Sequence, residues 1–165
     1  MLFCMKSLIT NRRARMDFEI LDTYEAGLEL FGFEVKAIRS GAGTLEGSRV
    51  VARAGEAYLV GASIPSYQPA NTPRSYDPTR TRRLLLSKKE IADMGRRGEQ
   101  KGLTIVPIMV YTRGRNIKLR IGVARGKKKQ DKRETLRKRD TERHIERTLK
   151  TQRTGHSLKA YGEQN

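Results

Sequence analysis

The sequence is poor in residues on which many protein functions depend. It has a single cysteine, Cys4, so an internal disulfide bond and a cysteine-based zinc site are both excluded. It contains no run of about 18 apolar residues, and a membrane-spanning helix is therefore not expected. The opening segment MLFCMKSLIT lacks the basic lead-in and the small-residue cleavage site of a secretory signal. Together with the scarcity of cysteine, this predicts a cytoplasmic protein.

Candidate catalytic groups are scarce too. The only histidines, His144 and His156, lie in a highly charged segment, where neither a buried base nor a metal-binding pair is expected. The phosphate-binding motif G-x-x-x-x-G-K-[ST] and the dinucleotide-binding motif G-x-G-x-x-G are absent. Carboxylates such as Glu25 and Glu29 fit exposed positions on a strand. The sequence therefore predicts a non-catalytic protein that needs no cofactor and no metal ion.

Negative charge is in short supply, because 18 acidic residues face 35 basic ones and leave a net charge of +17 at pH 7. Such a charge favours a polyanionic partner, nucleic acid before an acidic membrane. Residues 125–153 alone carry 13 basic and 5 acidic residues. This arm has too few aliphatic residues to dock on a core or to insert into a membrane. We expect it to be disordered alone and to become helical on its partner.

Aromatic residues are few as well, with four Phe, six Tyr and no Trp. Several of them, such as Phe18, Phe31 and Tyr111, fit core positions, which argues against a sheet that stacks on single-stranded bases. Recognition of a folded RNA through its shape and backbone is the more natural inference. On composition alone, a structural ribosomal protein and an RNA-processing enzyme stay open as alternatives.

The first 125 residues show a succession of strand patterns and turns. Alternating apolar and acidic residues predict strands at 18–21 and 28–31 around a turn at Tyr24–Gly27. A hairpin is predicted at 49–64, and a second one at 103–123, where a nearly continuous apolar strand with a bulge or an edge at Pro107 is followed by an alternating strand. Helices are predicted at 33–38 and after the capping box Ser87–Glu90. Residues 65–82 hold four of the five prolines and predict a long surface loop.

This order predicts a mainly β fold, a closed or nearly closed antiparallel barrel of about six strands with peripheral α-helices. The change in charge density predicts two parts. Residues 1–125 form the RNA-binding body, and residues 126–165 form the basic C-terminal tail.

Six motifs then occur in a fixed order. They are NRRAR from Asn11, YEAGLEL from Tyr24, GFEVKAIRSG from Gly32, RRLLLSKKEI from Arg82, KGLTIVP from Lys101 and GVARGKKKQDKRE from Gly122. With these separations the chain resembles the SsrA-binding protein family (small protein B) over residues 10–150. The resemblance implies an oligonucleotide-binding (OB-type) barrel.

The resemblance also implies partners and a process. The expected partner is transfer-messenger RNA (SsrA), whose tRNA-like domain the protein would bind and deliver to stalled ribosomes for trans-translation. There the nascent peptide is tagged for proteolysis and the ribosome is rescued. Elongation factor Tu with GTP would join through the RNA. The protein itself would act as a monomer, away from membranes and without catalysis.

Finally, the resemblance implies site residues by motif. For the tRNA-like domain these are Asn11, Arg12 and Arg13 of the basic lead, Glu25 of an E-A-G turn, Leu85 of the L-L-L strand, and Lys118 on the penultimate barrel strand segment. A turn-stabilising role for Glu25 and core packing for Leu85 stay open. For the ribosomal decoding centre they are Arg125, Lys127, Lys128, Gln130, Asp131, Lys132 and Arg133, and the helix that follows would lie in the empty messenger channel. Gln130 stands where relatives often have a ring that stacks.

Overall fold

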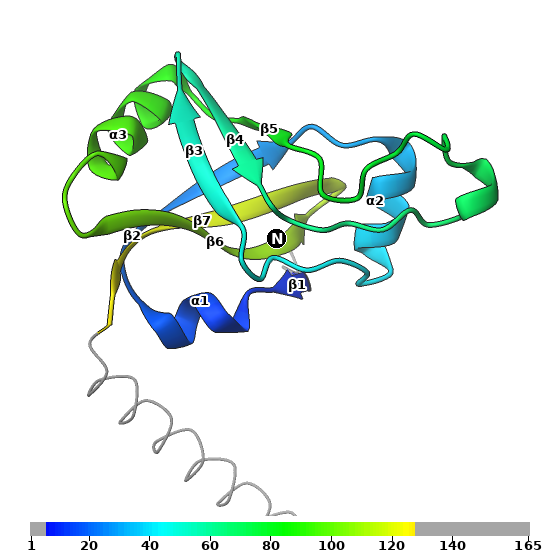
Figure 1. Ribbon diagram of the computed structural model, residues 1–165, viewed down its shortest axis with the longest axis horizontal. Helices are drawn as coiled ribbons and strands as arrows, with labels where there is room; N and C mark the ends of the chain where they lie inside the picture. The colour runs from blue at the N-terminus through cyan, green and yellow to red at the C-terminus, as the bar shows by residue number, and fades with distance from the viewer. Residues whose placement is uncertain (1–5, 128–165) are drawn as a thin grey trace, which may run out of the picture. The chain divides into compact units, whose positions relative to one another are not determined.

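The computed structural model describes residues 6–127 (Figure 1). The part up to Gly126 belongs to one compact unit. Cys4 and residues 128–165, which include most of the predicted tail, lie outside the described residues.

Within residues 6–127, seven strands form a single antiparallel sheet with the order β1-β6-β7-β2-β5-β4-β3. They are β1 (Lys6–Thr10), β2 (Phe18–Leu28), β3 (Arg49–Arg53), β4 (Glu56–Val60), β5 (Arg82–Leu85), β6 (Leu103–Arg113) and β7 (Asn116–Gly126). The predicted mainly β, antiparallel character is confirmed. The predicted hairpins correspond to β3–β4 and β6–β7, and the register of β6 shifts between Pro107 and Met109, where a bulge was expected.

The predicted closed barrel is wrong, because the two edge strands, β1 and β3, do not pair with each other. The segment β3–β4–β5 joins the rest of the sheet through two residue pairs, Gly27–Leu85 and Leu28–Leu84, and a backbone hydrogen bond from the Glu29 N–H to the Arg83 carbonyl. It therefore curls over the longer strands, as Figure 1 shows, and β3 contacts β6 rather than pairing with β1. An OB-type topology is not confirmed for the described residues.

Strand β2 replaces the turn that was predicted at Tyr24–Gly27. It runs from Phe18 to Leu28 and pairs with β7 from Phe18 to Gly27, with a register shift between Ile20 and Asp22. In the sequence, Ala26-Gly27 is typical of a turn, but in the structure these small residues allow neighbouring strands to pack closely. A Cβ atom on Gly27 would lie 3.2 Å from the Cβ of Leu85 on the neighbouring strand. Glycine here permits the approach of β5 rather than a reversal of the chain.

The helices are α1 (Arg12–Asp17), α2 (Gly32–Arg39), the short 3₁₀ turn η1 (Pro69–Asn71) and α3 (Lys88–Gly98). The predicted capping box is confirmed, because the Ser87 hydroxyl accepts from the Glu90 N–H while the Glu90 carboxylate accepts from the Ser87 N–H. Ile91 and Met94 are buried, as the pattern predicted. Strand β1 and helix α1 were not predicted, since both are short and the basic lead has little apolar periodicity.

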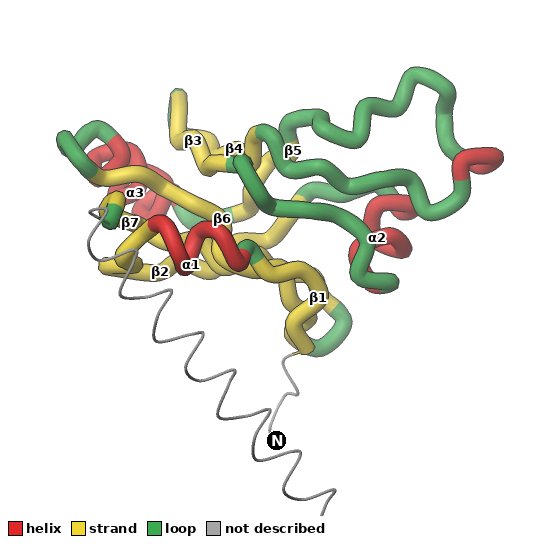
Figure 2. Tube along the Cα trace, turned by 60° about the horizontal axis from the view of Figure 1, so that its bottom comes forward, coloured by secondary structure: helices red, strands yellow, loops and turns green. Residues whose placement is uncertain are grey.

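The core lies between the curled sheet and its helices. Its fully buried side chains come from α2, α3 and most strands, and include Ile38, Leu59, Met94, Leu119 and Ile121. Helices α2 and α3 lie at opposite ends of the sheet in both views, and the loop between β4 and β5 extends beside α2 (Figure 2). This leaves one end of strands β2, β5 and β7 bordered by α2.

Candidate nucleic-acid interface

Three of the predicted RNA-binding residues come together on one face of the sheet. Gly27 of β2 pairs with Leu85 of β5 on one side and with Lys118 of β7 on the other. Directly paired residues of antiparallel strands point to the same face, as do residues two apart on one strand. Glu25 therefore shares this face. Lys118 is on β7, the last of the seven strands and not the penultimate one.

Leu85 forms an exposed ridge between two open grooves. Its exposed fraction is 55 %, so the core-packing alternative is wrong. One groove has a volume of about 430 Å³, and the polar residues that line it are Arg39, Arg115, Asn116 and Lys118. The other, of about 410 Å³, is lined by Glu25, Arg83 and Lys88 among others. We refer to Leu85, Glu25, Lys118 and these two grooves as the ridge surface.

Glu25 is held by two donors on β6. The Tyr111 hydroxyl donates to its Oε2, and the Arg113 guanidinium donates to its Oε1 at 2.9 Å. The hydrogen bond from Tyr111, together with Arg113 and the nearby charge of Lys118, lowers the pKa of Glu25 below its ordinary value. Since the residue lies inside β2, the alternative that it stabilises a turn is wrong.

The basic lead occupies a different surface. Arg12 and Arg13 are exposed on α1, where Arg13 makes a long ion pair with Asp17 at 3.8 Å. Arg13 also lines a third groove, of about 260 Å³, together with Asp17 and Arg49. Neither arginine lines the grooves beside Leu85.

Asn11 is buried, with an exposed fraction of 3 %. Its amide nitrogen donates to the carbonyl oxygens of Leu45 at 3.1 Å and Pro107 at 2.9 Å, and its side-chain oxygen accepts from the Ala14 N–H at 3.0 Å. The first two bonds tie the start of α1 to the body, and the third caps the helix. The structure therefore places Asn11 where it orients the arginines that follow it.

We expect Asn11→Ala to lower the free energy of unfolding by about 2 kcal/mol, because it removes a helix cap and the buried amide donor to the carbonyl oxygens of Leu45 and Pro107. Urea denaturation followed by circular dichroism measures this loss. An unchanged midpoint combined with weakened RNA binding would instead mean that Asn11 contacts RNA directly.

The predicted tail residues are only partly described. Arg125 is exposed near the end of β7, and Lys127 is half-buried. Lys128, Gln130, Asp131, Lys132 and Arg133 lie outside the described residues.

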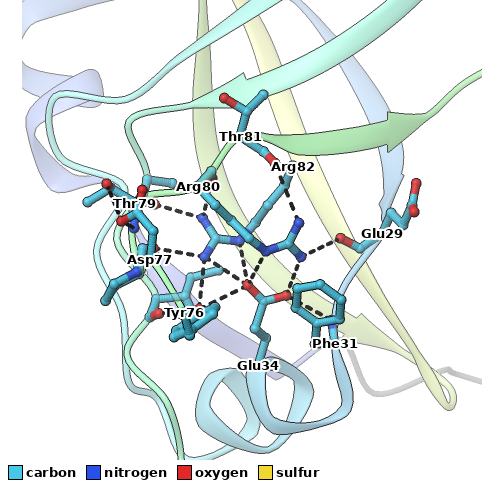
Figure 3. Close-up of polar contacts among 12 residues, drawn as sticks. Glu29, Phe31, Glu34, Tyr76, Asp77, Thr79, Arg80, Thr81 and Arg82 are labelled. Carbon is cyan, nitrogen blue, oxygen red and sulfur yellow. Dashed lines mark hydrogen bonds and ion pairs between the residues drawn. The ribbon is translucent and has the colours of Figure 1, made fainter. Parts of the chain in front are cut away.

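Glu34, Arg80 and Arg82 form a charge cluster that the sequence did not predict (Figure 3). The side chains of Glu34 and Arg82 are both fully buried and form an ion pair at 2.9 Å. Arg80 reaches the same carboxylate from the loop, at 2.6 Å. The Tyr76 hydroxyl lies 3.0 Å from Glu34 Oε1, and the Phe31 N–H donates to Oε2 at 2.8 Å.

This cluster fixes two walls of the ridge surface relative to each other. Glu34 is on α2, whose Val35 and Arg39 line the larger groove, and Arg82 is on β5, which carries Leu85. Tyr76 and Arg80 also anchor the loop that the prolines predicted. A sequence signal existed, because Glu34 lies one turn before Ile38 and so falls on the buried stripe of α2.

Phe31 is not a core residue, contrary to expectation. Its exposed fraction is 51 %, with its ring stacked on Phe33 and the Arg80 guanidinium over it at 4.2 Å. Phe18 is half-buried, and Tyr111 is buried as predicted.

Two kinds of site are absent from the part of the chain that the structure describes. No group of His, Cys, Asp or Glu residues within 6–127 could hold a metal ion. No helix in this range is long and apolar enough to cross a membrane.

Fold and surface together define a class: a mainly β, strongly basic protein with exposed grooves lined by cations. Residues 8–151 match the model of the SmpB protein family. The SsrA-binding protein of Gloeothece citriformis is 47 % identical over 145 residues, which are 88 % of this chain and 94 % of the relative. That of Mesoplasma florum is 46 % identical over 140 residues, 85 % of this chain and 94 % of the relative.

A solved structure described as "tmRNA-SmpB: a journey to the center of the bacterial ribosome" is similar as well. It has a TM-score of 0.63 and 43 % sequence identity, over 78 % of this chain and 94 % of that chain. The chain therefore belongs to the SmpB protein family, as the six motifs predicted.

Proposed function

We propose that this protein binds the tRNA-like domain of transfer-messenger RNA and delivers it to stalled ribosomes for trans-translation. Its relatives are named SsrA-binding proteins, and the similar solved structure joins tmRNA, SmpB and the ribosome in its description. The observation on this chain that carries the proposal is the ridge surface. Leu85 is exposed between a groove whose charged lining residues are all cations and a groove lined by both cations and carboxylates. An exposed leucine in this setting contributes little to the core and suits contact with a folded RNA.

Each part of the ridge surface has a distinct task in this proposal. Lys118, Arg39 and Arg115 neutralise phosphates and release their counterions, which gives affinity. Leu85 packs against an unstacked base or a sugar, which fixes the register of the RNA. The arginines of α1, Arg12 and Arg13, add phosphate contacts on a separate surface. None of these steps makes or breaks a covalent bond, so the protein acts as a non-catalytic adaptor.

The basic C-terminal tail carries the second part of the proposed function, which is action on the ribosome. In this proposal residues 1–125 hold the RNA while residues 126–165 enter the ribosome. There Lys127, Lys128, Lys132 and Arg133 contact ribosomal RNA phosphates in the decoding centre, with Asp131 and Gln130 between them. The helix that follows occupies the messenger channel only where no messenger fills it. Elongation factor Tu with GTP joins through the RNA, and the protein acts as a cytoplasmic monomer.

Leu85→Ala tests the ridge surface. We expect binding of a labelled tRNA-like domain transcript to weaken about tenfold, since each buried methylene group of an aliphatic side chain contributes about 0.8 kcal/mol. Because Leu85 is more than half exposed, the thermal unfolding midpoint stays unchanged.

Leu21→Ala is the matched control for that measurement. Leu21 lies on β2, the strand next to β5, and is 47 % exposed, but it lines neither groove beside Leu85. Fluorescence anisotropy compares the two variants with the unmodified protein. Equal affinities for all three would contradict RNA binding at this surface.

A further inference from the structure

We infer that Glu25 acts as a positioning residue, and that the group it presents to the RNA is the guanidinium of Arg113. Arg113 carries no role in the predicted site, whereas Glu25 was predicted there as a residue that binds the tRNA-like domain. The inference rests on the proposed function, because the RNA concerned is the tRNA-like domain.

The contacts of Glu25 are the first reason. Both of its carboxylate oxygens already have a donor, Tyr111 on Oε2 and Arg113 on Oε1. Tyr111 is 1 % exposed and its ring lies under the Arg120 guanidinium, at 5.2 Å, so its hydroxyl is a fixed point. A carboxylate that is held by a buried hydroxyl can in turn hold an exposed arginine in one direction.

The exposure of Arg113 is the second reason. Its side chain is 60 % exposed, against 32 % for Glu25, so the solvent-facing member of the pair is the cation. One of its five N–H donors binds Glu25, which leaves the rest of the planar fork for a phosphate. Because the ion pair removes freedom that a long side chain would lose on binding, it pre-organises the contact.

The surrounding charge is the third reason. The charge of Lys118 acts on the Glu25 carboxylate, and Arg120 is the residue of β7 that pairs with Glu25. Three cations therefore surround one carboxylate, and the cluster keeps a net positive charge that suits a phosphate. An isolated carboxylate on this face would repel RNA, whereas one that is neutralised by Arg113 does not.

The decisive experiment is a double-mutant cycle. Affinity of the full chain for a labelled transcript of the tRNA-like domain is measured between about 0.05 and 0.3 M KCl. The proteins are the unmodified chain, Glu25→Ala, Arg113→Ala, the double variant and Arg113→Lys. Arg74→Ala is the matched control, since Arg74 is exposed on the loop and lines neither groove beside Leu85. Thermal melting of each variant checks that the fold is intact.

We expect Arg113→Ala to weaken binding about tenfold and to lower the slope of log affinity against log salt by about one. Glu25→Ala does the same, although it removes a negative charge and simple electrostatics would strengthen binding. In the Arg113→Ala background, Glu25→Ala then causes no further loss. Arg113→Lys restores the salt slope but not the full affinity, because lysine lacks the planar fork. Arg74→Ala has a much smaller effect.

Other results separate the inference from the proposed function. If Glu25→Ala weakens binding as much without Arg113 as with it, Glu25 contacts RNA itself and the inference is wrong, while the proposed function stands. The inference is also wrong, and the proposed function again stands, if Arg113→Ala behaves like Arg74→Ala. If the unmodified chain does not bind the transcript above its affinity for an unrelated RNA of equal length, the proposed function fails and this inference with it.

Discussion

Deletion of residues 127–165 is expected to abolish the tagging of nascent peptides on stalled ribosomes while changing the affinity for the tRNA-like domain by no more than a few fold. The deleted segment carries 13 basic and 6 acidic residues and almost no aliphatic surface. It therefore contributes little to packing on the body. Its long-range electrostatic attraction for RNA is screened beyond roughly 8 Å at physiological salt. A tagging assay on a stalled messenger and an anisotropy titration measure the two effects on the same preparation.

The control for this deletion is a shorter one that removes residues 154–165. That segment holds one basic residue outside histidine, Lys159, and one acidic residue, Glu163, so its loss leaves the net charge unchanged. We expect tagging to continue after the shorter deletion. If the longer deletion abolishes binding of the tRNA-like domain, the proposed division between body and tail is wrong.

Glu34→Ala is expected to lower the free energy of unfolding by about 3–5 kcal/mol, the range for breaking a buried ion pair from one side. The substitution leaves the fully buried Arg82 without its carboxylate and frees Arg80 from α2. Because the same cluster fixes α2 against β5, binding of the tRNA-like domain weakens as well. Urea denaturation measures the first effect, with the exposed Glu29→Ala as a control expected to change stability by less than about 0.5 kcal/mol.

The pH dependence of the folding stability gives a second test of the cluster around Glu34. Burial acts to raise the pKa of Glu34, but hydrogen bonds from Arg80 and Phe31 and the charge of Arg82 outweigh it, so the pKa is lowered. A lowered pKa means that this stabilisation is present above the ordinary pKa of a glutamate and is lost as the pH falls through the folded value. The stability difference between the unmodified chain and Glu34→Ala therefore narrows on acidification. A difference that stays constant from pH 7 to about 3 would contradict this account.

Local sequence signals predicted the elements that depend on neighbours in the chain. The capping box at Ser87, the bulge at Pro107 and the hairpin turns need only residues within a few positions. The path of β2 could not be found in this way, because Gly27 reads as a turn residue until Leu85, 58 positions later, is placed against it. The prediction of a closed barrel failed for a related reason. The curl of β3–β5 depends on the short pairing between β5 and β2, which joins residues far apart in the sequence.

The candidate site likewise contains residues that the sequence predicted and contacts that it did not. The motifs pointed to Glu25, Leu85 and Lys118, and the strand register brings these three together. The motifs did not show that Asn11 is buried or that Arg113 holds Glu25, because both facts depend on side-chain contacts between residues 96 and 88 positions apart in sequence. The cluster around Glu34 joins residues up to 48 positions apart and has only a faint local signal.

The most direct test of the central claim is the capture of this protein, tagged, from its own cells, followed by sequencing of the RNA that it carries. We expect one abundant RNA with an alanine-acceptor end and an internal reading frame, strongly enriched over ribosomal RNA and reduced in the Leu85→Ala variant. Bulk ribosomal RNA without such an enriched species would contradict the claim and indicate a structural ribosomal protein instead.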